Sequence, residues 1–206
     1  MNALDTLDCD VLVLGIGNLL WADEGFGVRC VEQLAAEWEL PPGITVMDGG
    51  TQGLYLLPYV QAARRLIVFD AIDYGLEPGT MKRVEGDEVP RFMGAKKMSL
   101  HQTGFQEVIS AADLTGQLPE SLLLIGVQPE ELEDYGGSLR PAVKARLGDA
   151  VAMAIAQLCE WGFEPRQRRT PSVGSDALAM AAYETGRPSA DAACRFGDAR
   201  FLAEGA

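Results

Sequence analysis

The 206-residue sequence contains one histidine, His101, and four cysteines without a Cys-x-x-Cys pair. Zinc motifs that need two histidines and paired-cysteine zinc knuckles are therefore excluded, and any histidine-dependent site must use His101. Wide spacing of the cysteines favours buried free thiols over a metal cluster or a redox pair. They are Cys9, Cys30, Cys159 and Cys194.

Basic residues and long apolar runs are also scarce. The 17 Lys and Arg against 30 Asp and Glu give a net charge of −13, which excludes the basic surface that nucleic acids and anionic membranes require. No apolar run reaches the roughly 18 residues of a membrane-spanning helix. The N-terminus lacks the basic start of a secretory signal, so we expect a cytoplasmic protein.

Short apolar runs alternate with helical patterns along the chain. The runs predict buried strands at 11–15, 44–47, 65–69 and 122–127, and a short edge strand at 80–84. The 3.6-residue patterns predict helices at 24–38, 54–62, 101–113 and 141–160. This alternation is typical of an α/β fold: a single domain with a mostly parallel, twisted sheet of about five strands and helices on both faces.

The domain is expected to cover residues 1–163. Residues 164–206 carry equal numbers of acidic and basic residues and show no dependable periodicity before a weak helix near 176–184. We expect this segment to be a partly disordered tail.

Carboxylates follow the predicted strands at the points where those strands end. Glu24 comes after the first strand, Asp48 after the second, and Asp70 and Asp73 after the third, while His101 precedes a helix. Ligands of open parallel sheets bind beyond the carboxyl ends of the strands. Two carboxylates and one imidazole are sufficient to hold a divalent metal with open positions, so Glu24, Asp70 and His101 are the favoured ligand set.

Structural roles are open for the same residues. Glu24 suits the N-terminal turn of a helix, where it opposes the dipole, and Asp23 suits the N-cap of that helix. Asp48 and Asp70 suit turns after their strands, Asp73 is expected to act in a turn, and a lone histidine is most often a hydrogen-bonded structural group.

Residues 15–20 (GIGNLL) begin like the dinucleotide-binding fingerprint G-x-G-x-x-G, but the sixth position is Leu20. A non-enzymatic metal-binding or nucleotide-binding module of α/β fold is therefore the alternative to an enzyme.

Four ordered blocks resemble the hydrogenase maturation endopeptidases, which process the large subunit of nickel–iron hydrogenases. The blocks are GIGNLL running into DEGFG at 15–27, DGGTQG at 48–53, DAIDYG at 70–75 with Pro78-Gly79, and HQTGF at 101–105. The resemblance covers roughly residues 10–160. It implies an endopeptidase that removes the C-terminal extension of the hydrogenase large-subunit precursor after nickel insertion, with nickel as the recognition motif.

The resemblance also implies roles for individual residues. Glu24, Asp70 and His101 correspond to metal-contacting residues of the family, and Asp48 to an aspartate needed for activity or substrate recognition. The ion is expected to be nickel supplied by the substrate, for which zinc or cadmium can substitute. Two mechanisms remain open: a metal-polarised carbonyl with a carboxylate base, or nickel recognition followed by aspartic-type chemistry. The precursor is the expected partner, and the enzyme is expected to be a monomer.

Overall fold

A five-stranded sheet forms the centre of the protein. The computed structural model describes residues 9–90, 100–172 and 180–186, except for the side chains of residues 100–103, 181 and 186. The sheet has the order β3-β1-β4-β6-β5. Four of its strands are parallel, and β5 pairs antiparallel with β6 at one edge. The bounds are β1 (Cys9–Ile16), β3 (Ile44–Gly50), β4 (Ala63–Ala71), β5 (Met81–Glu85) and β6 (Ser121–Val127).

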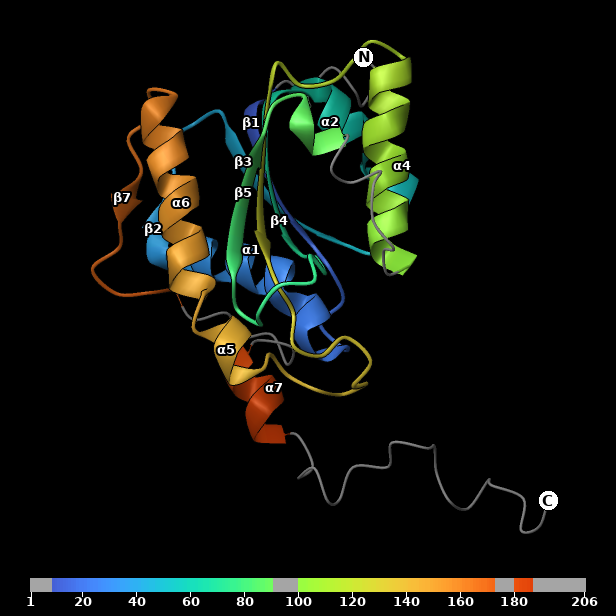
Figure 1. Cartoon of the computed structure of the whole chain (residues 1–206). Helices are drawn as coiled ribbons and strands as arrows, with labels where there is room; N and C mark the ends of the chain where they lie inside the picture. The colour runs from blue at the N-terminus through green and yellow to red at the C-terminus, as the bar shows by residue number, and fades with distance from the viewer. Residues whose placement is uncertain (1–8, 91–99, 173–179, 187–206) are drawn as a thin grey trace, which may run out of the picture.

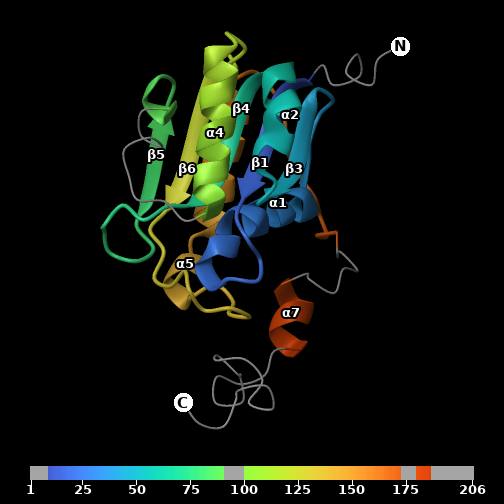
Figure 2. The same ribbon diagram turned by 90° about the vertical axis from the view of Figure 1, so that its right-hand side faces the viewer.

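Helices cover both faces of the sheet (Figures 1 and 2). On one face α1 (Phe26–Glu37) and α6 (Leu147–Glu160) pack on apolar side chains that include Val13, Ile67 and Ile125. On the other face α2 (Leu57–Ala62) and α4 (Leu100–Leu114) cover the alternate positions of the same strands. Strands buried on both faces explain the continuous apolar runs of the sequence. The predicted α/β fold is confirmed.

Short elements complete the chain. Two 3₁₀ turns, η2 (Ala22–Gly25) and η3 (Gly53–Leu56), follow β1 and β3, and α5 (Pro141–Lys144) precedes α6. The two-residue strands β2 (Trp38–Glu39) and β7 (Arg166–Gln167) form a separate antiparallel pair. No described helix combines the length and the apolar character that a bilayer span demands.

The chain reverses its direction across the sheet at β1. From β1 it moves to β3 on one side, and it then returns to β4 on the other side. The carboxyl ends of β1, β3, β4 and β6 therefore meet at one edge, which is the lower edge in Figures 1 and 2. A sheet of this kind binds its ligands at the crevice where the strand order reverses.

Two glycines allow α1 to lie directly on this crevice. A Cβ atom on Gly27 would lie 2.3 Å from the carbonyl oxygens of both Ile16 and Phe69, at the ends of β1 and β4. A Cβ atom on Gly15 would lie 2.3 Å from the carbonyl oxygen of Gly27. The helix and the two strands therefore approach closer than any larger residue permits.

Three expectations from the sequence need correction or completion. Asp23 does not cap α1, because its carboxylate is fully buried. The N-cap position is instead Gly25, which has no side chain to accept a hydrogen bond. Cys30 is buried as expected, but Cys159 is exposed and Cys9 is half-buried. Cys194 lies outside the described residues.

The described parts of the C-terminal segment contact the domain. The backbone N–H groups of Arg168 and Ser172 donate to Glu37 and Ala36 at the end of α1. The predicted weak helix is observed as α7 (Met180–Gly186), which lies below α5 in Figure 1. Its residue Met180 packs against the core cluster of α1 and α6. The expected partial disorder concerns residues outside the described ranges and stays a prediction.

Candidate functional site

Backbone pairing brings three of the four sequence blocks to the same edge. Gly15 pairs with Asp48 of β3 on one side and with Phe69, the neighbour of Asp70, on the other. Beyond Gly15, the Gly17 N–H donates to the Gly50 carbonyl at 3.0 Å. The acids that follow β1, β3 and β4 are therefore neighbours along the switch point, although they are far apart in the sequence.

A glycine fixes the position of Glu24. Gly17 has a φ of +137°, and a Cβ atom there would lie 1.8 Å from the Glu24 carbonyl oxygen. The same oxygen accepts a hydrogen bond from the Asn18 N–H at 3.2 Å. Glu24 lies in η2, two residues before α1, rather than in the first turn of that helix, and its side chain is half-buried. The loop after β1 thus folds back and holds Glu24 at the crevice.

Asp48 combines a turn role with an altered acidity. Its Oδ1 accepts the Gly50 N–H at 2.8 Å, which confirms the expected turn. Asp48 is exposed, but partial desolvation still raises the pKa of its carboxyl, while the Gly50 hydrogen bond and the charge of Arg29 act in the opposite direction. A carboxyl with a raised pKa is better suited to accept and return a proton than an ordinary aspartate. The turn therefore does not exclude a catalytic role.

Arg29 is a charged residue near the site that the sequence did not single out. It lies on the buried side of α1, is only 3% exposed, and pairs with Glu32 at 2.8 Å. The ring of Tyr183 in α7 lies 5.7 Å from its guanidinium carbon, so the C-terminal segment helps to cover this cation. No sequence signal links Arg29 to a residue so far along the chain.

Asp70 is fully buried at the end of β4. Burial raises the pKa of Tyr74, and the negative charge of Asp70 raises it further, so this phenol stays protonated. Tyr74 packs against Gly126, where a Cβ atom would lie 1.8 Å from the tyrosine oxygen, and Lys82 Nζ lies 5.3 Å from its ring. The glycine within the apolar run of β6 was the available sequence signal for this close approach.

Asp73 acts in a turn, as expected. Its Oδ1 accepts the Gly75 N–H at 2.9 Å and the Gln128 Nε2–H at 3.0 Å. The buried Gln128 amide in turn accepts the N–H groups of Tyr74 and Leu76 through Oε1. This network, which the sequence did not reveal, holds the segment that follows Asp70.

His101 lies in the first turn of α4, and its side chain is outside the described part of the structure. That turn is close to the block that follows Asp48, because a Cβ atom on Gly104 would lie only 3.4 Å from the Gly53 Cα. Among the described side chains, no three His, Cys, Asp or Glu residues could hold a metal ion. The ligand set of Glu24, Asp70 and His101 therefore stays a prediction.

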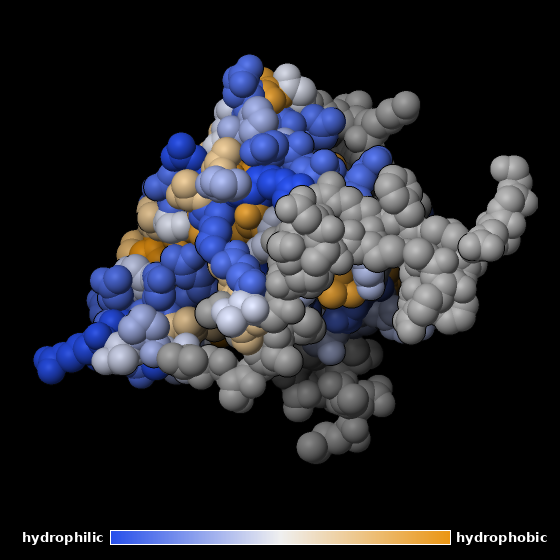
Figure 3. All heavy atoms as spheres, turned by 90° about the horizontal axis from the view of Figure 1, so that it is seen from below, coloured by the Kyte–Doolittle hydropathy of each residue, from blue (hydrophilic) through white to orange (hydrophobic). Residues whose placement is uncertain are grey.

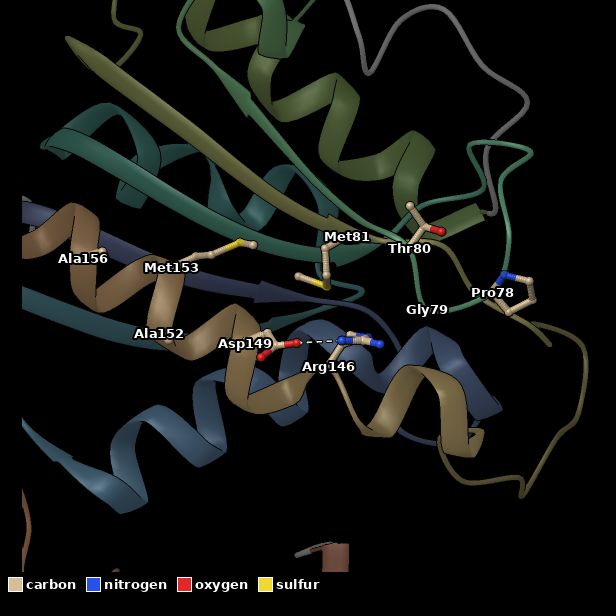
Figure 4. Close-up of a pocket in the computed structure, with 9 residues that line it drawn as sticks. All are labelled: Pro78, Gly79, Thr80, Met81, Arg146, Asp149, Ala152, Met153 and Ala156. Carbon is tan, nitrogen blue, oxygen red and sulfur yellow. Dashed lines mark hydrogen bonds and ion pairs between the residues drawn. The ribbon is translucent and has the colours of Figure 1, made fainter.

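A surface hollow of about 720 Å³ lies between the start of β5 and α6 (Figure 4). It is lined by Met81 and Met153 with an Arg146–Asp149 ion pair of 2.9 Å. None of the predicted site residues lines this hollow. The acidic edge, rather than the hollow, is the candidate site.

Fold and site together define a doubly wound α/β protein with an acidic site at its switch point. Comparison with known proteins gives the class: residues 28–157 match the family model described as hydrogenase maturation protease. The chain belongs to this family and is therefore a hydrogenase maturation endopeptidase, a hydrolase.

Two curated relatives match along almost the whole chain. HupD of Thiocapsa roseopersicina, a hydrogenase expression/formation protein, is 58% identical over 95% of this chain and 90% of its own length. HoxM of Cupriavidus necator, described in the same words, is 57% identical over 93% of this chain and 98% of its own.

A solved relative confirms the fold. The hydrogenase maturating endopeptidase HybD from E. coli is 42% identical, with a TM-score of 0.72 over 77% of this chain and 97% of its own. Almost all of that enzyme is matched, while about a quarter of this chain has no counterpart in it. The peptidase core is therefore common to both chains, and HupD and HoxM share more of this chain than HybD does.

Proposed function

We propose that this endopeptidase removes the C-terminal extension of a nickel–iron hydrogenase large-subunit precursor after nickel insertion, and that nickel is the recognition motif. The observation that supports the proposal is the placement of backbone segments: the loop with Glu24 and the end of β4 with Asp70 lie at one edge of the sheet, and the start of α4, which contains His101, contacts the block that follows Asp48. Two carboxylates and an imidazole form a donor set of borderline softness, which fits nickel, zinc or cadmium. The nickel ion belongs to the precursor, so it is part of the substrate.

In this proposal Glu24, Asp70 and His101 contact the nickel of the precursor and fix the adjacent peptide at the edge. A bound divalent ion supplies charge that polarises a nearby carbonyl. The burial of Asp70 strengthens such an interaction, because water competes less for a buried carboxylate.

Asp48 is proposed to handle the proton. Its Oδ1 is engaged by the Gly50 N–H, which leaves Oδ2 to accept the proton of the attacking water. The water oxygen bonds to the scissile carbonyl carbon, the C–N bond breaks, and Asp48 returns the proton to the leaving amine. The desolvation that raises the pKa of Asp48 favours this exchange.

The test uses purified precursor with and without nickel, followed by intact-mass analysis. We expect the enzyme to shorten only the nickel-loaded precursor. Glu24→Gln, Asp70→Asn and His101→Ala should each slow the cut by at least about 100-fold, as should Asp48→Asn. A precursor whose mass never changes would refute the function.

The control variant is Asp73→Asn, which keeps the carbonyl acceptor of the turn and should cut at nearly the wild-type rate. Wild-type rates for all three proposed ligand variants would refute the ligand assignment while leaving the peptidase intact. Equilibrium dialysis of the free protein against nickel, zinc and cadmium gives a readout that does not depend on cleavage. Sedimentation and cell fractionation test the expected cytoplasmic monomer.

A further inference from the structure

Exposed large hydrophobic side chains are concentrated at one edge of the described structure. Five of the six follow the carboxyl ends of parallel strands: Leu20 after β1, Leu54 and Tyr55 after β3, Leu76 after β4, and Tyr135 after β6. Tyr55 is 84% exposed and Tyr135 is 65% exposed. The sixth, Leu114, is 90% exposed and ends α4 at the opposite edge of the sheet.

Ring packing and backbone hydrogen bonds hold the segments that carry these side chains in place. The ring of Tyr135 packs edge-on against Trp21, with centroids 5.2 Å apart, and the Gly136 N–H donates to the Leu20 carbonyl at 2.7 Å. On the other side Leu54 and Tyr55 belong to η3, which begins at Gly53 against α4. Apolar side chains on a fixed backbone lose little freedom when a partner covers them.

The same segments carry the proposed site. Leu20 lies in the loop that folds back onto Glu24, and η3 follows the Asp48 turn and contacts the first turns of α4. Figure 3 views this face and shows hydrophobic areas among hydrophilic ones. Tyrosine and other large apolar side chains near a site, with polar groups around them, are typical of a surface that binds another protein.

The negative charge of this protein restricts the kind of polypeptide that can bind to this surface. The loop with Tyr135 also contains the acidic run Glu130-Glu131-Leu132-Glu133-Asp134, and the whole chain has a net charge of −13. Such a surface attracts basic polypeptides and repels acidic ones.

We propose that Leu20, Leu54, Tyr55, Leu76 and Tyr135 form the docking surface for the polypeptide substrate, and that the docked part of the substrate combines apolar with basic side chains. We call these five residues the apolar rim. This inference rests on the proposed function, because the occupant is the precursor whose extension is cut. Docking on the rim brings the scissile peptide to acids in the same loops, such as Glu24, which follows Leu20, and Asp48, which precedes Leu54.

The test compares Tyr55→Ser and Tyr135→Ser with the control Leu114→Ser in cleavage of the nickel-loaded precursor. The rim variants should each raise KM by about tenfold with kcat almost unchanged, since they remove binding that does not change between ground state and transition state. Leu114→Ser should leave both constants unchanged. Tyr55→Ser and Leu114→Ser should keep the thermal stability of the wild type, whereas Tyr135→Ser, which loses the ring contact with Trp21, should lower it slightly.

Binding of the uncut precursor, measured by calorimetry, separates this proposal from the peptidase assignment. If the wild-type protein binds the precursor but never cuts it, the proposed peptidase function is wrong. In that case, weaker binding of the precursor by Tyr55→Ser would still support the apolar rim as its docking surface. Added salt should weaken wild-type binding if basic side chains contribute. The rim is refuted if its variants bind and cut like Leu114→Ser, or if Tyr55→Ser only dissociates a dimer of this chain in sedimentation.

Discussion

Two glycines at the same helical position provide a test of how the switch point is built. Gly27 is the second residue of α1, and Gly148 is the second residue of α6. A Cβ atom on Gly148 meets nothing within 4 Å, whereas on Gly27 it would lie 2.3 Å from two backbone carbonyl oxygens. Both positions therefore gain the same helix propensity from alanine, but only one of them has space for its methyl group.

The expected effects have opposite signs. Alanine is better than glycine in a helix by about 1 kcal/mol, and Gly148→Ala should stabilise the fold by up to that amount. Gly27→Ala requires α1 to move away from the ends of β1 and β4 by several tenths of an ångström. Overpacking of this kind costs about 1–3 kcal/mol or more, and no flexible side chain is present to yield.

Thermal unfolding of both variants measures the difference. For a chain of this length, about 3 kcal/mol lowers Tm by roughly 6–12 °C, and Gly148→Ala should raise Tm by roughly 1–4 °C. Because α1 moves relative to the crevice, Gly27→Ala should also reduce precursor cleavage at temperatures where it remains folded. Equal melting temperatures for the two variants would show that the close contact at Gly27 does not exist.

Two further predictions concern a buried carboxylate, Asp23, and a half-buried one, Glu184. Asp23→Asn should lower the free energy of unfolding by about 2–4 kcal/mol in a denaturant titration. In the variant, an amide NH₂ group replaces a carboxylate oxygen and faces a backbone N–H group that has lost its acceptor. A loss below about 0.5 kcal/mol would contradict this prediction. Glu184 accepts Lys144 Nζ at 2.7 Å, and this hydrogen bond lowers the pKa of Glu184 despite opposing desolvation. The pair therefore stabilises α7 docking at neutral pH by at most about 1 kcal/mol, and this is lost as pH falls through the lowered pKa. The protection factors of the α7 amides, which are corrected for the slower intrinsic exchange at low pH, should fall on acidification in the wild type but much less in Glu184→Gln, and identical pH profiles would refute the coupling.

The sequence predicted the parts of the fold that follow from local pattern. Strands buried on both faces appear as apolar runs, so β1, β4 and β6 were found, and the Lys82-Arg83 pair correctly marked β5 as an edge strand. The acids after each strand were found for the same reason, since a polar residue that ends an apolar run is conspicuous.

Contacts between distant segments could not be predicted in the same way. The C-terminal segment has no dependable periodicity before its weak helix, and nothing in that helix pattern indicates what it contacts, yet Glu184 pairs with Lys144 and accepts the Ser138 hydroxyl, and Tyr183 lies over Arg29. A seven-residue helix such as α7 is too short to be stable alone, so its formation depends on these contacts. The residues around one partner of such a pair do not indicate which distant residue it contacts.

The adjacent acids Asp23 and Glu24 show why the structure is needed to choose a ligand. Both follow β1 and both looked able to serve at a helix start. Asp23 is fully buried and accepts the backbone N–H groups of Glu130, Glu131 and Arg140 at 2.7 to 2.9 Å. These three hydrogen bonds occupy most of the lone-pair positions of a carboxylate, so Asp23 is committed to holding the 130–140 loop. Glu24 is half-buried at the crevice, and its position there depends on the loop that Asp23 anchors. One acid therefore builds the edge of the sheet, and its neighbour is the one that we propose as a nickel contact.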